Sequence, residues 1–236
     1  MNQKIHHAIL KKARESSDRT RHLELETSDG AGFHFAAGQF ISIHMEWNGN
    51  RYARAYSIAS ALRPDRRFEL CMREAPDDPA TAWLDGLREG DSIEFTGPFG
   101  YFKLREPPDA VSAFVATGTG IAPIRAMIQQ FHARPAGGEA WLIFGVRHEE
   151  DILYREELEA LEHENPNFHF VPTLSRAEPG WTGHRGYVQA HVEKYLAAKK
   201  GLHVYVCGAP QMVQEVRQVL ASMGYTHESV SYEKYE

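Results

Sequence analysis

Residues 110–131 read AVSAFVATGTGIAPIRAMIQQF and combine an apolar run, a glycine-rich turn and an amphipathic segment. The apolar run at 111–116 is typical of a strand that is buried on both faces. From Ile121 onward, apolar residues recur at the spacing of a helix. A strand, a glycine turn and a helix in this order present backbone N–H groups and a positive helix end to a phosphate. The stretch therefore predicts a phosphate-binding turn in a sheet with helices around it.

The turn itself, Thr117-Gly118-Thr119-Gly120, carries the glycines that such a site needs. Gly118 and Gly120 would let the backbone approach a ligand without a Cβ in the way. Pro123 suits the first turn of a helix, where its missing N–H costs nothing. It also stands where the usual dinucleotide fingerprint has its third glycine, so an ordinary strand-to-helix turn remains an alternative.

Downstream of this stretch, strand patterns alternate with helix patterns, which indicates βαβ units and a parallel sheet. The expected strands are 111–116, 140–144, 169–174, 203–207 and one near Val230; the expected helices are 122–132, 154–163, 188–196 and 211–223. Ligands of such sheets bind beyond the carboxyl ends of the strands. The residues at those ends are therefore candidates for the site.

Three arginines, Arg147, Arg176 and Arg185, follow strands or lie in the loops at strand ends. Their guanidinium groups could bind a nucleotide phosphate, although solvated surface arginines would fit the same pattern. Cys207 and Gly208 end another strand, and Cys207 could equally be a simple core cysteine.

Upstream, the chain has the pattern of an antiparallel β domain. Its short runs, separated by turn residues, are 5–13, 21–27, 39–46, 51–58, 67–73 and 92–95, with one short helix at 79–87 and a turn at 97–100. Such strands favour a barrel or sandwich. The periodicity changes after Pro107-Pro108, so a domain boundary is expected near Glu106 to Asp109, between an antiparallel β-barrel at 1–106 and an α/β domain at 107–236.

Three features of the first half could carry chemistry. Arg54 and Tyr56 share one face of a strand, so a guanidinium could bind a pyrophosphate beside an aromatic ring, with the Ser57 hydroxyl at the ligand's edge. Thr81 begins the short helix and could hold a phosphate or simply cap the helix. The backbone of 69–73 could hydrogen-bond the edge of a ligand. A surface arginine with a half-buried tyrosine is the structural alternative for the first feature.

Composition excludes several classes of protein. The net charge of −6 and the absence of an arginine-rich arm argue against nucleic-acid binding. Two cysteines cannot form a disulfide framework or a four-cysteine iron–sulfur site. The sequence contains no run of about 18 apolar residues that could span a membrane, and its first residues lack the apolar core of a signal peptide. A cytoplasmic protein is expected.

The ordered set of motifs resembles the ferredoxin–NADP reductase-like family of flavin oxidoreductases over nearly the whole chain. The motifs are RAYS at 54–57, the helix-initial Thr81, GPFG at 97–100, TGTGIAP at 117–123, VCGAPQMV at 206–213 and EKY near the end.

The resemblance implies that the barrel holds FAD. Arg54 would bind its pyrophosphate, Tyr56 would pack on the isoalloxazine, and Ser57 would lie near flavin N5. Further contacts would come from the backbone of Cys71, Met72 and Arg73 and from Thr81 at the phosphates.

In the second domain, the resemblance implies an NADPH or NADH site shaped by Gly118, Thr119, Gly120 and Pro123. Cys207 and Gly208 would lie beside the nicotinamide, Glu233 near the flavin, and Tyr235 would shield the flavin ring. Ser57, Cys207 and Glu233 would be the catalytic residues.

The choice of donor and acceptor stays open at this point. Ser175 and Arg176 resemble the pair that binds the 2′-phosphate in NADPH-selective relatives, whereas 181–183 with Gly186 also occurs in NADH-using oxygenase reductases; NADPH is favoured slightly.

The expected acceptor is a small carrier such as ferredoxin or flavodoxin. A reductase component of an oxygenase, a free-flavin reductase and a non-catalytic flavin-binding subunit are the alternatives. Arg63, Arg66 and Arg67 could form a basic docking surface or a solvated loop.

Overall fold

The computed structural model describes residues 4–16, 19–28, 33–73, 78–105, 111–133, 138–199 and 201–235. These residues form two compact units. The first contains Met1–Leu104 together with Arg125–Gln130, and the second contains Arg105–Ile124 and Phe131–Glu236. The boundary predicted near 106–109 lies outside the described residues, so its position stays a prediction.

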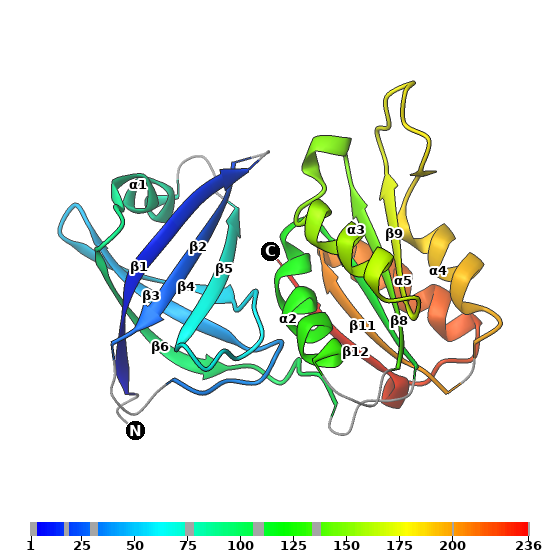
Figure 1. The fold of residues 1–236 in the computed structure, drawn as a ribbon, viewed down its shortest axis with the longest axis horizontal. Coiled ribbons are helices and arrows are strands. Elements are labelled where there is room, and N and C mark those ends of the chain that lie inside the picture. Colours follow the sequence, from blue (N-terminus) through cyan, green and yellow to red (C-terminus); the bar gives the residue numbers. More distant parts are fainter. Residues whose placement is uncertain are drawn as a thin grey trace. The chain divides into compact units, whose positions relative to one another are not determined.

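The first unit is built around one six-stranded antiparallel sheet in the order β4-β3-β6-β1-β2-β5 (Figure 1). Its strands are β1 (Ile5–Ser16), β2 (Thr20–Thr27), β3 (Phe40–Trp47), β4 (Asn50–Ser57), β5 (Arg67–Arg73) and β6 (Ser92–Phe99). The bridge between Ile58 and Leu70 joins the two ends of this order, which closes the sheet into the predicted barrel.

Alternation of side chains explains why these segments form a barrel. In β3, Ile41, Ile43 and Met45 are buried while the residues between them are more exposed. Every second residue of a strand points to the same face, so each strand contributes one apolar row to the interior. Phe33, Phe68 and Phe95 pack edge to face within that interior.

The predicted turn at 97–100 is wrong in part, because residues 97–99 continue β6. Phe99 pairs with Phe40 of β3, and a register shift between Phe40 and Ser42 accommodates the bend. The Gly97–Pro98 peptide is cis, and Gly97 has φ 145°. Gly and Pro at these two positions therefore serve a bent strand rather than its end.

The second unit has a six-stranded parallel sheet in the order β10-β9-β8-β7-β11-β12. Its strands are β7 (Val111–Thr117), β8 (Glu139–Val146), β9 (Phe168–Leu174), β10 (His184–Arg185), β11 (His203–Gly208) and β12 (Val230–Lys234). The connecting helices are α2 (Ile121–His132), α3 (Arg155–Glu164), α4 (Val188–Leu196) and α5 (Pro210–Ser222), with short 3-10 turns at Gly118–Gly120, Glu149–Asp151 and His227–Ser229.

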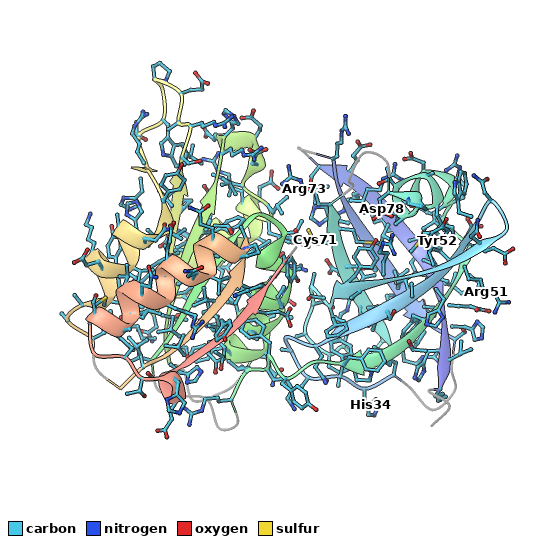
Figure 2. The ribbon with its side chains drawn as sticks, turned by 180° about the vertical axis from the view of Figure 1, so that it is seen from behind. His34, Arg51, Tyr52, Cys71, Arg73 and Asp78 are labelled. Atoms are coloured by element: carbon cyan, nitrogen blue, oxygen red, sulfur yellow. The ribbon has the colours of Figure 1, made fainter. Side chains whose placement is uncertain are left out.

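Helices cover both faces of this sheet, with α3 in front in Figure 1 and α5 in front when the molecule is turned in Figure 2. α4 and α5 pack with Val115, Ile143 and Val206 in one apolar cluster. Parallel strands that are covered on both faces are continuously apolar, which is the pattern read from the sequence. The two-residue strand β10 was not predicted, because it is too short to show a pattern.

No helix within the described ranges is long and apolar enough to cross a membrane. Within the same ranges, His, Cys, Asp and Glu side chains form no group of three that could hold a metal ion.

Candidate functional site

In the first unit, the predicted pyrophosphate ligand Arg54 projects from β4 toward the start of α1 (Pro79–Gly86). Its Nε and Nη2 atoms donate to the two carboxylate oxygens of Asp78, each over 3.1 Å. Nη1 donates to the Ala53 carbonyl over 3.1 Å, and the guanidinium lies 5.9 Å from the Tyr52 ring centroid. Figure 2 labels both of these neighbours, Asp78 and Tyr52. Arg54 therefore binds a carboxylate through two parallel hydrogen bonds, in a bidentate arrangement.

Asp78 rather than Thr81 is the N-cap of α1, which corrects the alternative interpretation of Thr81. The Oδ1 atom of Asp78 accepts from the Ala80 N–H over 2.8 Å, as capping side chains do. The hydrogen bonds from Arg54 and from Ala80 hold the pKa of the Asp78 carboxyl below its usual value. Thr81 lies in the first turn of the helix, and its proposed contact with a phosphate stays a prediction.

Tyr56 and Ser57 follow Arg54 on the same strand. Tyr56 packs against the barrel core, and burial together with the Asp78 charge raises the pKa of its phenol to about 12. The ring is therefore neutral at physiological pH and suited to apolar contact with a flat ligand. Ser57 is buried, with 6% of its surface exposed. The strand thus brings a cation, an aromatic ring and a hydroxyl into sequence along one segment.

The strand predicted to offer its backbone, β5, stands last in the strand order of the sheet. Its ladder with β2 runs from Arg67 to Arg73 along one edge, and the bridge from Leu70 to Ile58 lies on the other. Cys71 and Met72 are buried, whereas Arg73 is exposed. The roles of Cys71, Met72 and Arg73 in binding a ligand through the backbone stay predictions.

In the second unit, the glycine turn after β7 meets the end of β11. A Cβ added to Gly120 would lie 2.4 Å from the Cys207 carbonyl oxygen, and one added to Gly208 would lie 2.2 Å from Thr117 Oγ1. Thr117 Oγ1 also accepts from the Ala209 N–H over 3.3 Å. Close backbone approach therefore requires glycine at both positions, a constraint that composition alone could not reveal.

Gly118 meets a different constraint, because an added Cβ there would find nothing within 4 Å. Its φ of 53° lies in the left-handed region, which glycine adopts without strain. Thr119 lies in the same 3-10 turn, and Pro123 is the third residue of α2. The turn thus leaves open space in front of its first glycine, directly before the N-terminus of a helix, where an anion is favoured.

Cys207, Glu233 and Tyr235 lie together at the carboxyl end of β11. Cys207 pairs with Glu233 in the ladder with β12, and the Tyr235 N–H donates to the Gly208 carbonyl over 2.9 Å. Cys207 is fully buried, so burial and the Glu233 charge raise the pKa of its thiol well above the usual value, against a hydrogen bond from Tyr235. The full burial of Cys207 confirms the core cysteine that the sequence offered as an alternative, and the raised pKa of the thiol favours the neutral form.

The loops after β8 and β9 run side by side. Ser175 N–H donates to the Val146 carbonyl over 3.0 Å, and Arg176 N–H donates to the Arg147 carbonyl over 2.9 Å. Both arginine side chains are exposed. Arg147, Arg176 and Ser175 therefore lie at the carboxyl edge of the sheet, where a nucleotide phosphate is predicted to bind.

Arg185 is bound differently from the other two arginines. Its Nη1 donates to the Ala177 carbonyl over 3.0 Å, and its Nη2 donates to the carbonyls of Glu178 and Trp181 over 2.9 and 2.7 Å. The guanidinium thus supports the loop at 177–181. Its predicted contact with a phosphate stays untested, but its bonds to three carbonyls indicate a supporting role.

Two of the three arginines offered as a basic docking surface, Arg63 and Arg67, pair with carboxylates. Arg63 pairs with Asp65 over 2.6 Å and with Glu24 over 3.4 Å. Arg67 pairs with Glu24 over 2.9 Å and with Glu26 over 3.3 Å. The charges of Arg63 and Arg67 are thus paired within the unit, which weakens the prediction of a basic docking surface at Arg63, Arg66 and Arg67.

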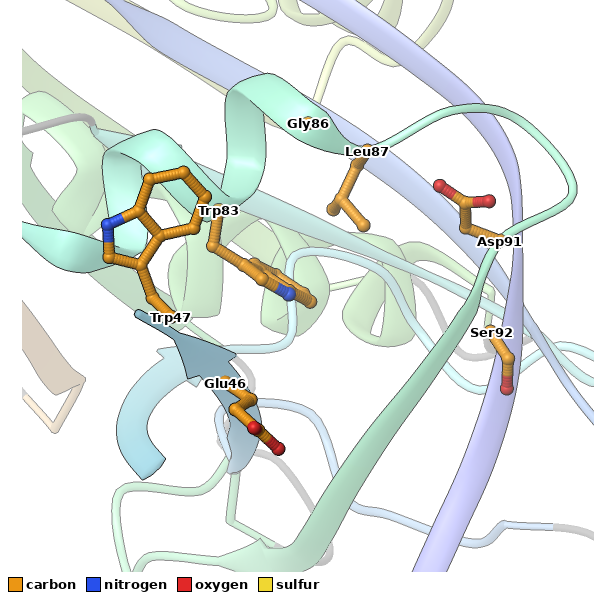
Figure 3. Close-up of a pocket in the computed structure, with 7 residues that line it drawn as sticks. All are labelled: Glu46, Trp47, Trp83, Gly86, Leu87, Asp91 and Ser92. Atoms are coloured by element: carbon orange, nitrogen blue, oxygen red, sulfur yellow. The ribbon is translucent and has the colours of Figure 1, made fainter. Parts of the chain in front are cut away.

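A hollow of about 400 Å³ lies at the other end of α1 (Figure 3). Its walls come from Glu46, Trp47, Trp83, Gly86, Leu87, Asp91 and Ser92. No residue of the predicted site lines it, so the candidate site is not this hollow.

Sequence reasoning missed two residues of the site, Asp78 and Tyr52. An aspartate followed by proline is a signal for a helix N-terminus, which could have identified Asp78 as the cap. The pairing of Asp78 with Arg54 spans 24 positions, and no local pattern encodes it. Tyr52 alternates in phase with Arg54 and Tyr56, so strand periodicity could have placed it on the same face.

The chain matches the family model of the oxidoreductase FAD-binding domain over residues 7–104 and that of the oxidoreductase NAD-binding domain over residues 114–218. It is 38% identical to ferredoxin–NADP reductase B of Sorangium cellulosum over 236 residues, which cover 97% of each chain. It is 29% identical to the toluate 1,2-dioxygenase electron transfer component of Pseudomonas putida, covering 97% of this chain and 67% of that one. Among solved structures, an Amycolatopsis cytochrome P450 reductase superimposes with a TM-score of 0.88 at 27% identity, covering 99% of this chain and 71% of that one.

These matches define a two-domain flavin oxidoreductase, with an FAD-binding barrel followed by an NAD-binding α/β domain. The chain belongs to the ferredoxin–NADP reductase-like family.

The donor sets of both units fit these cofactors. In the barrel, Arg54 and the first N–H of α1 already bind a carboxylate of the chain itself, so the position accepts an anion. In the α/β domain, the open space at Gly118 and the exposed cations Arg147 and Arg176 suit a phosphorylated nucleotide.

Proposed function

We propose that the protein takes a hydride from NADPH or NADH onto FAD and passes the electrons to a ferredoxin- or flavodoxin-type carrier. The observation that carries this proposal is the 38% identity, over 97% of both chains, to a protein named ferredoxin–NADP reductase. Two features of the structure support the proposal: the bidentate binding of a carboxylate by Arg54 in the barrel, and the glycine turn in the α/β domain.

The barrel residues would bind and orient the flavin. Arg54 would hold the pyrophosphate, Tyr56 would pack its neutral ring on the isoalloxazine, and the Ser57 hydroxyl would lie at the flavin edge. Bound FAD accepts two electrons as hydride and can release them one at a time. Cys71, Met72, Arg73 and Thr81 would contribute the remaining contacts.

The α/β residues would bind the pyridine nucleotide. Gly118, Thr119, Gly120 and Pro123 would shape the pyrophosphate site. The neutral Cys207 thiol and Gly208 would border the nicotinamide, where hydride transfer needs a reacting distance of about 3–3.5 Å. Glu233, paired in register with Cys207, would supply a carboxylate for proton control, and Tyr235 would shield the flavin ring.

The position of Arg176 favours NADPH over NADH. The backbone bonds that hold Ser175 and Arg176 beside Arg147 gather donors of the kind that a 2′-phosphate requires. We expect kcat/KM to be higher for NADPH than for NADH, and Arg176→Ala to reduce that preference mainly through KM for NADPH. An unchanged ratio in Arg176→Ala would refute the assignment.

The test of the proposed function is whether the purified chain retains FAD and oxidises NADPH. A yellow protein with a flavin spectrum that reduces ferricyanide, and reduces cytochrome c when ferredoxin or flavodoxin is added, is the expected result. A colourless preparation from a riboflavin-replete host that also fails to bind added FAD would contradict the proposal. If Ser57, Cys207 and Glu233 all prove dispensable, a non-catalytic flavin-binding subunit becomes the better interpretation.

A second candidate is the reductase of an oxygenase or a free-flavin reductase. The likeness to the toluate dioxygenase electron transfer component favours the first of these. The two cysteines of these 236 residues cannot form an iron–sulfur site of the four-cysteine type, so these residues do not themselves hold such a carrier. Faster turnover with an oxygenase component or with free FMN than with ferredoxin or flavodoxin would favour this candidate.

A further inference from the structure

The Asp78 carboxylate occupies the donors that the proposed pyrophosphate site would use. Its two oxygens accept from Arg54 Nε and Nη2, and Oδ1 also accepts from the Ala80 N–H. The first position of α1, Pro79, has no N–H to offer, and the Thr81 N–H donates to the Asp78 carbonyl over 2.9 Å. Each of these donors at the start of α1 therefore binds some part of Asp78.

A phosphate and a carboxylate make the same demand on these groups. Both accept two parallel N–H bonds from a guanidinium, and both are favoured at a helix N-terminus. They carry charge of the same sign, so they cannot share one Arg54 without repulsion. Binding a pyrophosphate here requires the Asp78 side chain to leave.

We propose that Asp78 is a built-in competitor of the FAD pyrophosphate, which holds Arg54 in the flavin-free protein and sets the affinity for FAD. The proposal rests on the proposed function, because it takes the Arg54 site to be the place of the flavin pyrophosphate.

The surroundings allow this exchange. The Asp78 side chain is 30% exposed, so it can turn into water without burying its charge. The Arg54 bond to the Ala53 carbonyl and its position near the Tyr52 ring do not involve Asp78, so both can hold the guanidinium when the carboxylate leaves. The guanidinium thus stays oriented for the incoming ligand, which receives the Arg54 fork and the Ala80 N–H together.

The test is the dissociation constant of FAD from the full chain stripped of flavin, measured by flavin fluorescence. Asp78→Asn removes the charge and keeps both the side-chain shape and a good capping residue. Since an exposed ion pair is weak, we expect FAD to bind about three- to tenfold more tightly to Asp78→Asn than to the wild type. An equal or weaker affinity overturns the proposal.

Two controls separate competition from a structural role. Asp85→Asn removes the same charge from the same helix, where Asp85 pairs with Arg21, and should leave the FAD affinity unchanged. Riboflavin has no phosphate, so Asp78→Asn should not tighten its binding. Equal tightening for riboflavin and FAD would contradict competition at the phosphate.

The melting temperature of the flavin-free protein is a second measurement, and it should change in the opposite direction to the FAD affinity. The flavin-free Asp78→Asn protein should unfold at a slightly lower temperature, because it has lost the pair with Arg54, although it binds FAD more tightly. If Asp78→Asn lowers both the unfolding temperature and the affinity for FAD, Asp78 only supports the fold, and the proposal is overturned. If the wild type binds FAD and the variant matches it, the proposed function stands and this inference fails. If neither protein binds FAD, both fail.

Discussion

At the scale of single residues, Cys207 illustrates how burial decides chemistry. A cysteine at the end of a strand beside a predicted nicotinamide site could be a nucleophile or a packing residue. Full burial and the charge of Glu233 raise the pKa of the thiol, so we expect Cys207 to contribute contact and hydrogen bonding rather than a thiolate. The residue therefore has to act without becoming charged.

We expect Cys207→Ala to slow hydride transfer on the order of ten- to a hundredfold while FAD remains bound. The physical reason is that a small misplacement of the nicotinamide removes it from reacting distance. Stopped-flow reduction of the flavin by NADPH measures the rate, and the flavin spectrum reports the retained cofactor. Reduction at the wild-type rate would reject the role.

The charge of Glu233 should affect the rate at which the Cys207 thiol is alkylated. Because that charge raises the pKa of the thiol, Glu233→Gln should lower it and increase the thiolate fraction at a given pH. We therefore expect faster alkylation of Cys207 by iodoacetamide at pH 8 in Glu233→Gln. Peptide mass spectrometry separates Cys207 from Cys71, and an equal rate in both proteins would show that Glu233 exerts no such effect.

At the scale of elements, the two glycines of the turn between β7 and α2 are required for different reasons. Gly120→Ala places a Cβ 2.4 Å from the Cys207 carbonyl oxygen, so we expect the free energy of unfolding to fall by about 1–3 kcal/mol. Gly118→Ala meets open space, and its left-handed φ costs about 1 kcal/mol.

The pair makes a matched test of the turn. In Gly118→Ala the new methyl group stands where a ligand would approach, so the Kd of NADPH should rise more than stability falls. In Gly120→Ala the stability loss should dominate. Calorimetry and nucleotide titration of both variants provide the comparison, and the reverse order would contradict the assignment of Gly118.

The loop at 177–181 depends on Arg185, whose guanidinium binds three carbonyl groups. We expect Arg185→Ala to speed proteolysis within this loop while the melting temperature changes little. Arg185→Lys should not restore protection, because one ammonium group cannot reproduce the planar fork. Unchanged proteolysis would show that the loop is held by other contacts.

Much of the element plan could be predicted from periodicity. The helix at 188–196 and the strand at 67–73 have the bounds that the sequence predicted, and the other long elements differ at their ends by a few residues. What the sequence could not show are contacts between distant segments, such as Gly120 against Cys207 or Arg54 with Asp78. The predicted turn at 97–100 failed because Gly and Pro also serve bent strands.

At the scale of the whole molecule, stability should fall in acid. Burial lowers the pKa of His22 from 6.5 to about 4, with the charges of Arg14 and Arg125 acting in the same direction. The unfolded chain therefore binds a proton at His22 before the folded one does, so stability is lost as the pH falls from about 6.5 to about 4. His132 and His184, whose pKa values are also lowered by burial, act in the same direction.

Urea unfolding at pH 7 and at pH 5 measures this loss. His22→Gln should reduce the difference between the two pH values, and His34→Gln, which removes an exposed imidazole from the same unit, is the matched control. An undiminished difference in His22→Gln would place the acid sensitivity elsewhere.

The strand order of the barrel has a consequence for synthesis on the ribosome. β6 lies between β3 and β1 and is the last strand of the barrel in the sequence. Until residues 92–99 have left the exit tunnel, β1 and β3 lack the partner that covers their edges, and open edges are prone to pair with other molecules. A stall just before β6 should therefore make the nascent barrel a substrate for chaperones, and a stall well beyond it should release a closed one.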